Sequence, residues 1–274
     1  MSEIDPKTEV APHEARRFKS TVAYYQRHRL AYPDRLIARV AALAGLRPGN
    51  SVLDLGAGTG MLAVGFAKAG MTVTAMDPEP DMLAVCQEAA QAAGVTVALR
   101  QGGSADLTPD MGPFRLVTMG RSFHWMDRAA TLAMLEQIVT PDGGVALFHD
   151  AHPPVPDNGW FKVMCDVQDR FGRGTERHIR ERRGGHSRYE PFLLASQFTQ
   201  LDGLSVTVRH AVTVDELVGR AFSMSTCSRE KLGNRAEEFA AALSAALREL
   251  SPGGTFTEIA EMVAVLARRP GQDA

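Results

Sequence analysis

Three glycines at alternate positions are the clearest candidates for chemistry in this chain. Gly56, Gly58 and Gly60 stand in the run Val52-Leu53-Asp54-Leu55-Gly56-Ala57-Gly58-Thr59-Gly60, directly after a short apolar segment. Glycine has no Cβ, so the backbone here can adopt positive φ and can lie close to a ligand. A helix that begins just after such a turn also presents free N–H groups. The run therefore predicts a nucleotide-like ligand at the end of a strand.

The spacing of the glycines narrows the choice of ligand. A dinucleotide fingerprint reads G-x-G-x-x-G, whereas this run reads G-x-G-x-G and has Met61 where the last glycine of that fingerprint would stand. Asp54 lies two residues before the first glycine. A carboxylate there would repel a pyrophosphate, but it suits the ammonium and sulfonium charges of S-adenosylmethionine. The alternative is a generic nucleotide-binding turn or a purely structural one.

Two further carboxylates stand at strand ends downstream. Asp77 ends the second predicted strand, where a carboxylate can accept hydrogen bonds from both ribose hydroxyls. Asp106 follows the third strand and can accept a hydrogen bond from an adenine amino group, while Met82 can pack on the ring. Because the carboxyl ends of parallel strands meet at one edge of a sheet, these groups should converge there. Neighbouring residues expected at the same site are Ala57, Pro78, Ser104, Ala105 and Arg121.

The segment after the fourth predicted strand is expected to face the reacting group. His124 could act as a general base, because an unperturbed histidine has a pKa near 6.5; the alternative is that it only bonds the backbone and shapes a pocket. Trp125 could form a wall of that pocket. His149 and His152 end the fifth strand at the same edge. We expect substrate contacts from Trp125, His149, His152, His186 and Tyr189, and we predict no metal site, since the H-D-x-H spacing alone is a weak signal.

An arginine-rich stretch precedes Tyr189. It holds Arg170, Arg173, Arg177, Arg180, Arg182, Arg183 and Arg188. One interpretation is a lid that binds an anionic acceptor, with Gly184-Gly185 as a hinge. A second is a nucleic-acid contact, although few aromatic residues are interleaved. The third is a solvated helix with Glu–Arg pairs four residues apart.

The elements that must position these residues alternate regularly up to residue 150. Apolar strands are predicted at 51–55, 72–76, 95–99, 114–119 and 144–148, with helices at 61–69, 81–93 and 129–139 between them. This alternation predicts a parallel sheet covered on both faces. After 150 the pattern changes to irregular helices over 158–200, an edge strand over 204–214, helices at 215–224 and 235–250, and a last strand over 256–267. The predicted parts are N-terminal lid helices (1–44), a core (45–150), a helical cap insertion (151–203) and C-terminal strands and helices that complete the sheet (204–274).

Composition limits the class of protein. The 274 residues carry 30 basic and 32 acidic side chains, a net charge of −2, which argues weakly against nucleic acid as a partner. The three cysteines are far apart and form no C-x-x-C pair, so a disulfide framework or zinc site is not expected. The acidic start lacks the apolar segment of a signal peptide, and no long apolar run predicts a membrane helix. A cytoplasmic location is therefore the default expectation.

At residues of about 15–150 the chain resembles the class I S-adenosylmethionine-dependent methyltransferases, in the small-molecule branch often labelled methyltransferase type 11. The resemblance implies a Rossmann-like, doubly wound sheet of seven strands, mostly parallel, whose last two strands form an antiparallel edge. It also implies that Asp54 and the glycines hold the methionine end of the cofactor, Asp77 the ribose and Asp106 the adenine. The S-F-H-W run at 122–125 resembles small-molecule enzymes, and the N/D-P-P-Y/F run of many base-amine methyltransferases is absent from this position.

The N-terminal stretch carries a second resemblance to that branch. Tyr25-Gln26-Arg27-His28-Arg29-Leu30-Ala31-Tyr32-Pro33 is similar to a Y-x-x-x-R-P-x-Y-P run that lies over the cofactor, with Leu30 where the family commonly has proline. The resemblance implies that Tyr25 and Arg29 contact the methionine carboxylate; the alternative is a solvated basic helix face. We therefore expect methyl transfer to a small organic acceptor, at oxygen, nitrogen or carbon, in secondary-metabolite tailoring. The rival functions are an RNA or protein methyltransferase and a non-catalytic cofactor-binding module.

Overall fold

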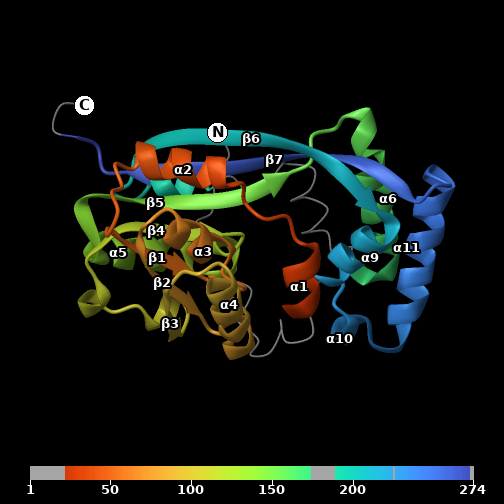
Figure 1. Cartoon of the computed structure of the whole chain (residues 1–274), viewed down its shortest axis with the longest axis horizontal. Coiled ribbons are helices and arrows are strands. Elements are labelled where there is room, and N and C mark those ends of the chain that lie inside the picture. The colour runs from red at the N-terminus through yellow and green to blue at the C-terminus, as the bar shows by residue number, and fades with distance from the viewer. Residues whose placement is uncertain (1–21, 174–188, 225, 272–274) are drawn as a thin grey trace.

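A seven-stranded sheet organises the chain (Figure 1). The computed structural model describes residues 22–173, 189–224 and 226–271. The strands are β1 (Ser51–Leu55), β2 (Thr72–Asp77), β3 (Val97–Gln101), β4 (Phe114–Gly120), β5 (Val139–Ala151), β6 (Gln200–Thr213) and β7 (Thr255–Arg268). They lie in the order β3-β2-β1-β4-β5-β7-β6. Strands β1 to β5 pair in parallel, and β7 pairs antiparallel with both β5 and β6. The predicted mostly parallel sheet with an antiparallel edge is confirmed.

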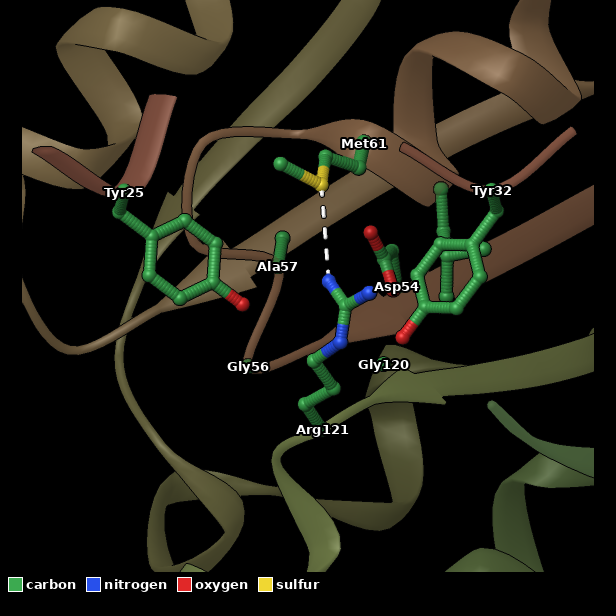
Figure 2. Close-up of a pocket in the computed structure, with 9 residues that line it drawn as sticks. Tyr25, Tyr32, Asp54, Gly56, Ala57, Met61, Gly120 and Arg121 are labelled. Atoms are coloured by element: carbon green, nitrogen blue, oxygen red, sulfur yellow. Dashed lines mark hydrogen bonds between the residues drawn. The ribbon is translucent and has the colours of Figure 1, made fainter. Parts of the chain in front are cut away.

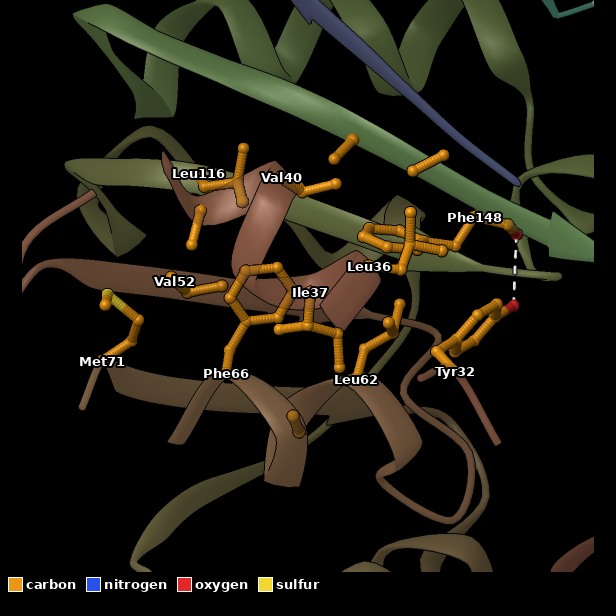
Figure 3. Close-up of a cluster of buried hydrophobic side chains, with 14 of the residues drawn as sticks. Tyr32, Leu36, Ile37, Val40, Val52, Leu62, Phe66, Met71, Leu116 and Phe148 are labelled. Atoms are coloured by element: carbon orange, nitrogen blue, oxygen red, sulfur yellow. Dashed lines mark hydrogen bonds between the residues drawn. The ribbon is translucent and has the colours of Figure 1, made fainter. Parts of the chain in front are cut away.

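Except at the edge strand β3, the parallel strands carry buried apolar side chains on both faces, because helices cover both faces of the sheet. Alternate residues of β1 show this, since Val52 belongs to one buried cluster and Leu53 to another. The first cluster lies beneath α2 (Asp34–Leu43), α3 (Met61–Lys68) and α4 (Pro80–Ala92), and Figure 3 shows Phe66 of α3 packed close to Ile37 of α2. The second lies beneath α5 (Arg128–Ile138) and α8 (Glu190–Leu194).

A third buried cluster belongs to a separate group of helices, which we call the helical cap. The cap consists of α6 (Gly159–Gln168), α9 (Val214–Phe222), α10 (Arg229–Leu232) and α11 (Ala236–Leu250), packed around Trp160, Phe222 and Phe239. Helices α9 to α11 are inserted between β6 and β7, and these two strands extend from the sheet to the cap (Figure 1). The predicted division placed residues 214–250 in the part that completes the sheet. In the structure the helices of these residues pack with α6.

The N-terminal helix α1 (Val22–His28) lies at the cap end of the molecule, against α9. Short helical turns connect the larger elements. They are η1 (Ser104–Asp106), η2 (Pro109–Met111), η3 (Phe123–Trp125), η4 (Pro156–Asn158), η5 (Asp169–Arg173) and η6 (Gly233–Arg235). Among the described residues, no helix has both the length and the apolar composition that crossing a membrane requires.

Most predicted strand boundaries differ from the structure, and the largest shifts are the start of β5, at Val139 rather than Gly144, and the start of β6, at Gln200 rather than Leu204. β3 begins at Val97 rather than at Val95, because the N–H of Val95 bonds to the carbonyl of Ala90 and so ends α4. β5 is longer than the predicted 144–148, because its far end, up to Ala151, pairs with β7. This extension carries Asp150 into the region of the glycine turn.

The edge strand β6 is covered on its outer side. Arg35 and Arg39 stand one turn apart on α2 and donate to the carbonyl oxygens of Thr207 at 2.8 Å and Ser205 at 3.3 Å. Unpaired edge groups invite pairing with another sheet. These two arginines therefore reduce the exposure of a strand that is 14 residues long.

Candidate active site

The glycine turn after β1 is closely packed on one side and open on the other. Gly56 has a φ of +70°, and a Cβ there would lie 2.5 Å from the Cβ of Ser122. Gly60, with a φ of +82°, begins α3, and a Cβ there would lie 2.4 Å from Sγ of Cys86. Gly58 also has positive φ, but a Cβ there would meet nothing within 4 Å. At positions 56 and 60 both the positive φ and the close contacts disfavour a side chain, whereas at 58 only the positive φ does so. The space beside Gly58 is open.

Asp54 places a buried carboxyl group beneath this turn. Its side chain is 1% exposed, and it accepts hydrogen bonds from the N–H of Ala63 at 3.0 Å and from Oγ1 of Thr118 at 2.9 Å. Burial raises the pKa of Asp54 to about 7, and these two hydrogen bonds only partly oppose that effect. A cationic group placed beside Asp54 would favour its ionised form. The residue that the sequence assigned to the cationic end of a cofactor thus has the electrostatics for that task.

A small pocket lies directly over Asp54 (Figure 2). Its lining combines the glycine turn with the N-terminal segment and the end of β4. The lining residues are Tyr25, Tyr32, Asp54, Gly56, Ala57, Met61, Leu62, Gly120 and Arg121. Five of these, Tyr25, Asp54, Gly56, Ala57 and Arg121, were predicted from the sequence to bind the cofactor, whereas Met61, Leu62 and Gly120 were not. Tyr32 stood only as a motif position in the N-terminal run.

Arg121 crosses this pocket and connects its walls. Its guanidinium forms an ion pair with Asp150, donates to the carbonyl oxygen of Leu30 at 2.9 Å, and lies 4.7 Å from the ring centre of Tyr32. Burial alone would raise the pKa of Asp150, but the Arg121 guanidinium holds it well below its usual range. The backbone φ of Arg121 is +57°, a conformation that is strained in residues other than glycine. Arg121 therefore links the N-terminal segment to the sheet at the pocket.

Arg29 brings a second buried cation to the N-terminal side. Its guanidinium lies 5.3 Å from the ring centre of Tyr25, and its Nε is buried with no hydrogen-bond partner among the described residues. Burial lowers the pKa of Arg29, because water is removed from the charged form. A buried guanidinium N–H without an acceptor favours a ligand that supplies one, such as a carboxylate. A cofactor carboxylate satisfies this condition, so the residues fit the methionine end of S-adenosylmethionine.

The ends of β2 and β3 supply the other carboxylates. Asp77 is 7% exposed and accepts hydrogen bonds from the N–H groups of Gly58 at 2.8 Å and Glu79 at 2.9 Å. Asp106 is exposed and accepts one from the N–H of Gly103 at 2.8 Å. A carboxylate has about four lone-pair sites, so both can accept further bonds. Met82, on α4, is 4% exposed, and Pro78, Ser104 and Ala105 lie after the ends of β2 and β3.

The predicted acceptor side has an aromatic wall. Oη of Tyr189 lies 3.5 Å from Nδ1 of His124, and the rings of His124 and Trp125 are 4.8 Å apart. Phe123 packs edge-on against Tyr189 at 5.4 Å. The structure thus brings His124, Trp125 and Tyr189 together, although they are up to 65 positions apart in the sequence. No local motif could have joined Tyr189 to the other two.

Of the other predicted acceptor residues, His152 lies apart from this wall. His152 is 2.6 Å from Oε1 of Glu258 and stacks on Phe161, in the cap rather than at the pocket. His149 lies in β5, opposite Val263 of β7. His186 and most of the arginine-rich stretch lie outside the described residues. Within the part of the chain that the structure describes, no three His, Cys, Asp or Glu side chains gather as a metal site.

Comparison with known proteins agrees with this geometry. Residues 52–143 match the sequence model of the methyltransferase domain family. An uncharacterized methyltransferase of Mycobacterium tuberculosis is 32% identical over 155 residues, which is 57% of this chain and 60% of that protein. The chain thus spans less than two thirds of the length of this relative.

Two solved structures share the fold. The YcgJ protein of Bacillus subtilis superposes with a TM-score of 0.53 at 19% identity, over 87% of this chain and all of that one. A methyltransferase of Thiobacillus denitrificans, solved with S-adenosylhomocysteine, superposes with a TM-score of 0.52 at 19% identity, over 93% and 99%. These two structures show the fold that the chain shares with them, and the family match identifies residues 52–143 as a methyltransferase domain.

Proposed function

We propose that this chain transfers the methyl group of S-adenosylmethionine to a small organic acceptor. The observation that carries the proposal is the arrangement of opposite charges at one site. The Asp54 carboxyl group lines the pocket, and Arg29, whose buried Nε has no hydrogen-bond partner among the described residues, lies on the N-terminal side beside Tyr25. An amino-acid end carries both an ammonium and a carboxylate, so it matches both groups. When bound, the cofactor supplies an electrophilic methyl group on a sulfonium.

The chain's own residues then have distinct tasks. Asp54 binds the cationic end, Arg29 and Tyr25 bind the carboxylate, and Asp77 accepts hydrogen bonds from the ribose. Asp106 and Met82 hold the adenine. The N-terminal segment, tied to the sheet by Arg121, covers the pocket and excludes water, which strengthens these electrostatic contacts.

His124 is the proposed proton acceptor when the methylated group is a hydroxyl or a carbon acid. A neutral amine would need no such base before transfer. The Tyr189 hydroxyl, 3.5 Å from Nδ1 of His124, would help to hold the orientation of the imidazole ring. The lining by Trp125 and Tyr189 favours an acceptor with a flat apolar portion, and secondary-metabolite tailoring is the proposed setting. Whether the arginine-rich stretch selects an anionic acceptor stays a prediction from the sequence.

Calorimetric titration with S-adenosylmethionine tests the binding half of the proposal. We expect Asp77→Ala to weaken the affinity by about 1–3 kcal/mol, through lost charged hydrogen bonds, while His124→Gln leaves it unchanged. Equal affinity of the wild type and Asp77→Ala would remove Asp77 from the site.

A transfer assay with labelled methyl donor tests the catalytic half. The acceptor panel contains amines, phenols, carboxylates and RNA, and formation of S-adenosylhomocysteine is measured. Tight cofactor binding without transfer to any acceptor would support a non-catalytic binding module. Transfer to RNA alone, with a strong loss at high salt, would support a nucleic-acid methyltransferase. With the true acceptor, if this is a hydroxyl or a carbon acid, we expect His124→Gln to lower kcat.

A further inference from the structure

A buried ion pair at the junction of the sheet and the helical cap has no role in the site described above. Glu258 of β7 is fully buried, and both of its oxygens bond the Arg220 guanidinium of α9, at 2.5 and 2.9 Å. His152 and His210 approach the same carboxylate, at 2.6 and 3.0 Å. Burial would raise the pKa of Glu258, but its hydrogen bonds to His152 and Arg220 bring it to about 2. We call these four residues the Glu258 cluster.

Arg220 also reaches the N-terminal helix. Its Nε donates to the carbonyl oxygen of His28 at 3.1 Å, and His28 is the last residue of α1. The ring of His28 lies against Gly219, where a Cβ would be 2.3 Å from Nε2. The end of α1 is therefore seated on α9 by a carbonyl contact and by close packing that only glycine permits.

The residue after this contact is Arg29, whose buried Nε has no hydrogen-bond partner among the described residues. Tyr25, one turn earlier on α1, lines the pocket itself. The first turn of α1 is held by the cap as well, because Nε of Arg229 donates to Oη of Tyr24 at 2.8 Å. The positions of Tyr25 on α1 and of Arg29 directly after it thus depend on contacts with the cap residues Arg220 and Arg229, which are not part of the pocket lining.

Stability alone does not explain a buried ion pair at this place. Desolvation of two charges offsets most of their attraction, and well-packed apolar side chains of similar volume are often as stable or more so. The geometry here is specific, since one guanidinium uses its two terminal nitrogens on Glu258 and its third nitrogen on His28. Only arginine presents donors in this fixed fork.

We propose that Arg220 and Glu258 are positioning residues for the cofactor site. The pair anchors the end of α1 to β7, and through α1 it holds Arg29 and Tyr25 over the glycine turn. This inference rests on the proposed function, because it assigns the pair to binding of S-adenosylmethionine. It makes the cap, and not only the sheet, part of the cofactor site.

Arg220→Lys separates positioning from folding. Lysine keeps a positive charge for Glu258 but lacks the fork and the donor to His28. We expect the variant to fold, to bind S-adenosylmethionine at least about tenfold more weakly, and to show a raised KM for the cofactor with kcat at saturation changed by less than about twofold. Hydrogen exchange of the amides of residues 22–28 should become faster, which a local loss of packing elsewhere would not produce.

Arg268→Met is the matched control. Arg268 is another β7 residue whose ion pair, with Asp202 of β6 at 2.8 Å, joins two elements far from the pocket. This variant should lose stability in chemical denaturation and keep the wild-type cofactor affinity and the wild-type exchange of α1. Arg220→Met, if it folds, should resemble Arg220→Lys in cofactor affinity.

The outcomes distinguish failure of the proposed function from failure of the positioning role. Failure of the wild type to bind S-adenosylmethionine would overturn the proposed function. Wild-type binding together with unchanged affinity and unchanged α1 exchange in Arg220→Lys would overturn the positioning role alone. An equal loss of affinity in Arg268→Met would also overturn it, because the effect would then follow stability rather than the anchoring of α1.

Discussion

At the scale of single residues, Asp54 shows how burial prepares a group for its ligand. Two internal donors, Ala63 and Thr118, fix the carboxyl group, yet the loss of water still dominates and raises its pKa to about 7. Its ordinary value is 3.8. Between these two values the folded chain holds a proton that the unfolded chain has lost. The contribution of Asp54 to folding stability therefore falls as the pH rises from about 4 to 7.

Binding of a cation should reverse this trend. We expect the affinity for S-adenosylmethionine to rise between pH 6 and 7.5, because the ionised form of Asp54 attracts the cationic end of the cofactor. Calorimetric titration at several pH values measures this slope. Asp54→Asn should flatten this slope, because an amide does not titrate in this range. The variant should keep its structure, since the amide can accept from the N–H of Ala63 and donate to Oγ1 of Thr118, whose hydroxyl can turn toward the Leu53 carbonyl at 3.5 Å. A slope that persists in Asp54→Asn would assign the titration to another group.

Residues of the candidate site differ in how well the sequence could predict them. Asp54, Asp77 and the glycines could be predicted as site residues because they stand at or just after the ends of apolar strands at fixed spacing. Arg220 and Glu258 could not be found in this way. They meet only because β7 and α9 pack together, and neither stands in a local motif that would suggest a partner.

At the scale of elements, the turn between β1 and α3 places its three glycines under different demands. At Gly58 only the positive φ disfavours a side chain, because a Cβ there meets nothing within 4 Å. At Gly56 a Cβ would also collide with Ser122 at 2.5 Å, between the turn and the segment that leaves β4. Close packing at Gly56 therefore fixes the glycine turn against the segment that follows β4.

A pair of alanine substitutions measures this difference. Gly58→Ala should lower the free energy of unfolding by about 1–2 kcal/mol, the cost of a left-handed backbone conformation. Gly56→Ala should lower it by a further 1–3 kcal/mol or so, because the neighbouring segment must move. Urea denaturation of both variants is the measurement. Equal losses would mean that Ser122 adjusts freely and that the turn and the β4 end are not tightly coupled.

The strands themselves were predictable to within a few residues, because buried parallel strands are short apolar runs between glycine-bounded helices. Several boundaries were wrong, among them the starts of β3, β5 and β6. At two boundaries a specific contact decided the outcome, namely the bond of Val95 to Ala90 that ends α4 and the pairing of the end of β5 with β7. Both contacts depend on backbone geometry that a hydrophobic pattern does not encode.

At the scale of the whole molecule, β6 and β7 join the sheet to the helical cap. Each is 14 residues long, and they pair over their full length, from the sheet next to β5 to the cap beside α9. The sequence did not predict that helices 214–250 and α6 form one cluster, since their apolar faces are compatible with packing on the sheet as well. Covalent continuity through two long strands predicts that cap and sheet unfold together.

Phe239 provides the test of this coupling. It lies fully buried on α11, with ring contacts to Phe171 at 5.4 Å and Phe222 at 5.6 Å. Phe239→Ala should cost about 3–5 kcal/mol and should shift one common unfolding transition, because damage in the cap is transmitted to the sheet through β6 and β7. Leu250→Ala, on the same helix but 51% exposed, should be nearly neutral. Hydrogen exchange that shows the cap opening alone in Phe239→Ala, while β1 and β4 keep their protection, would contradict the coupling. Cap and sheet would then be independent units, and a loss of stability in the cap would not lower the stability of the sheet or of its glycine turn.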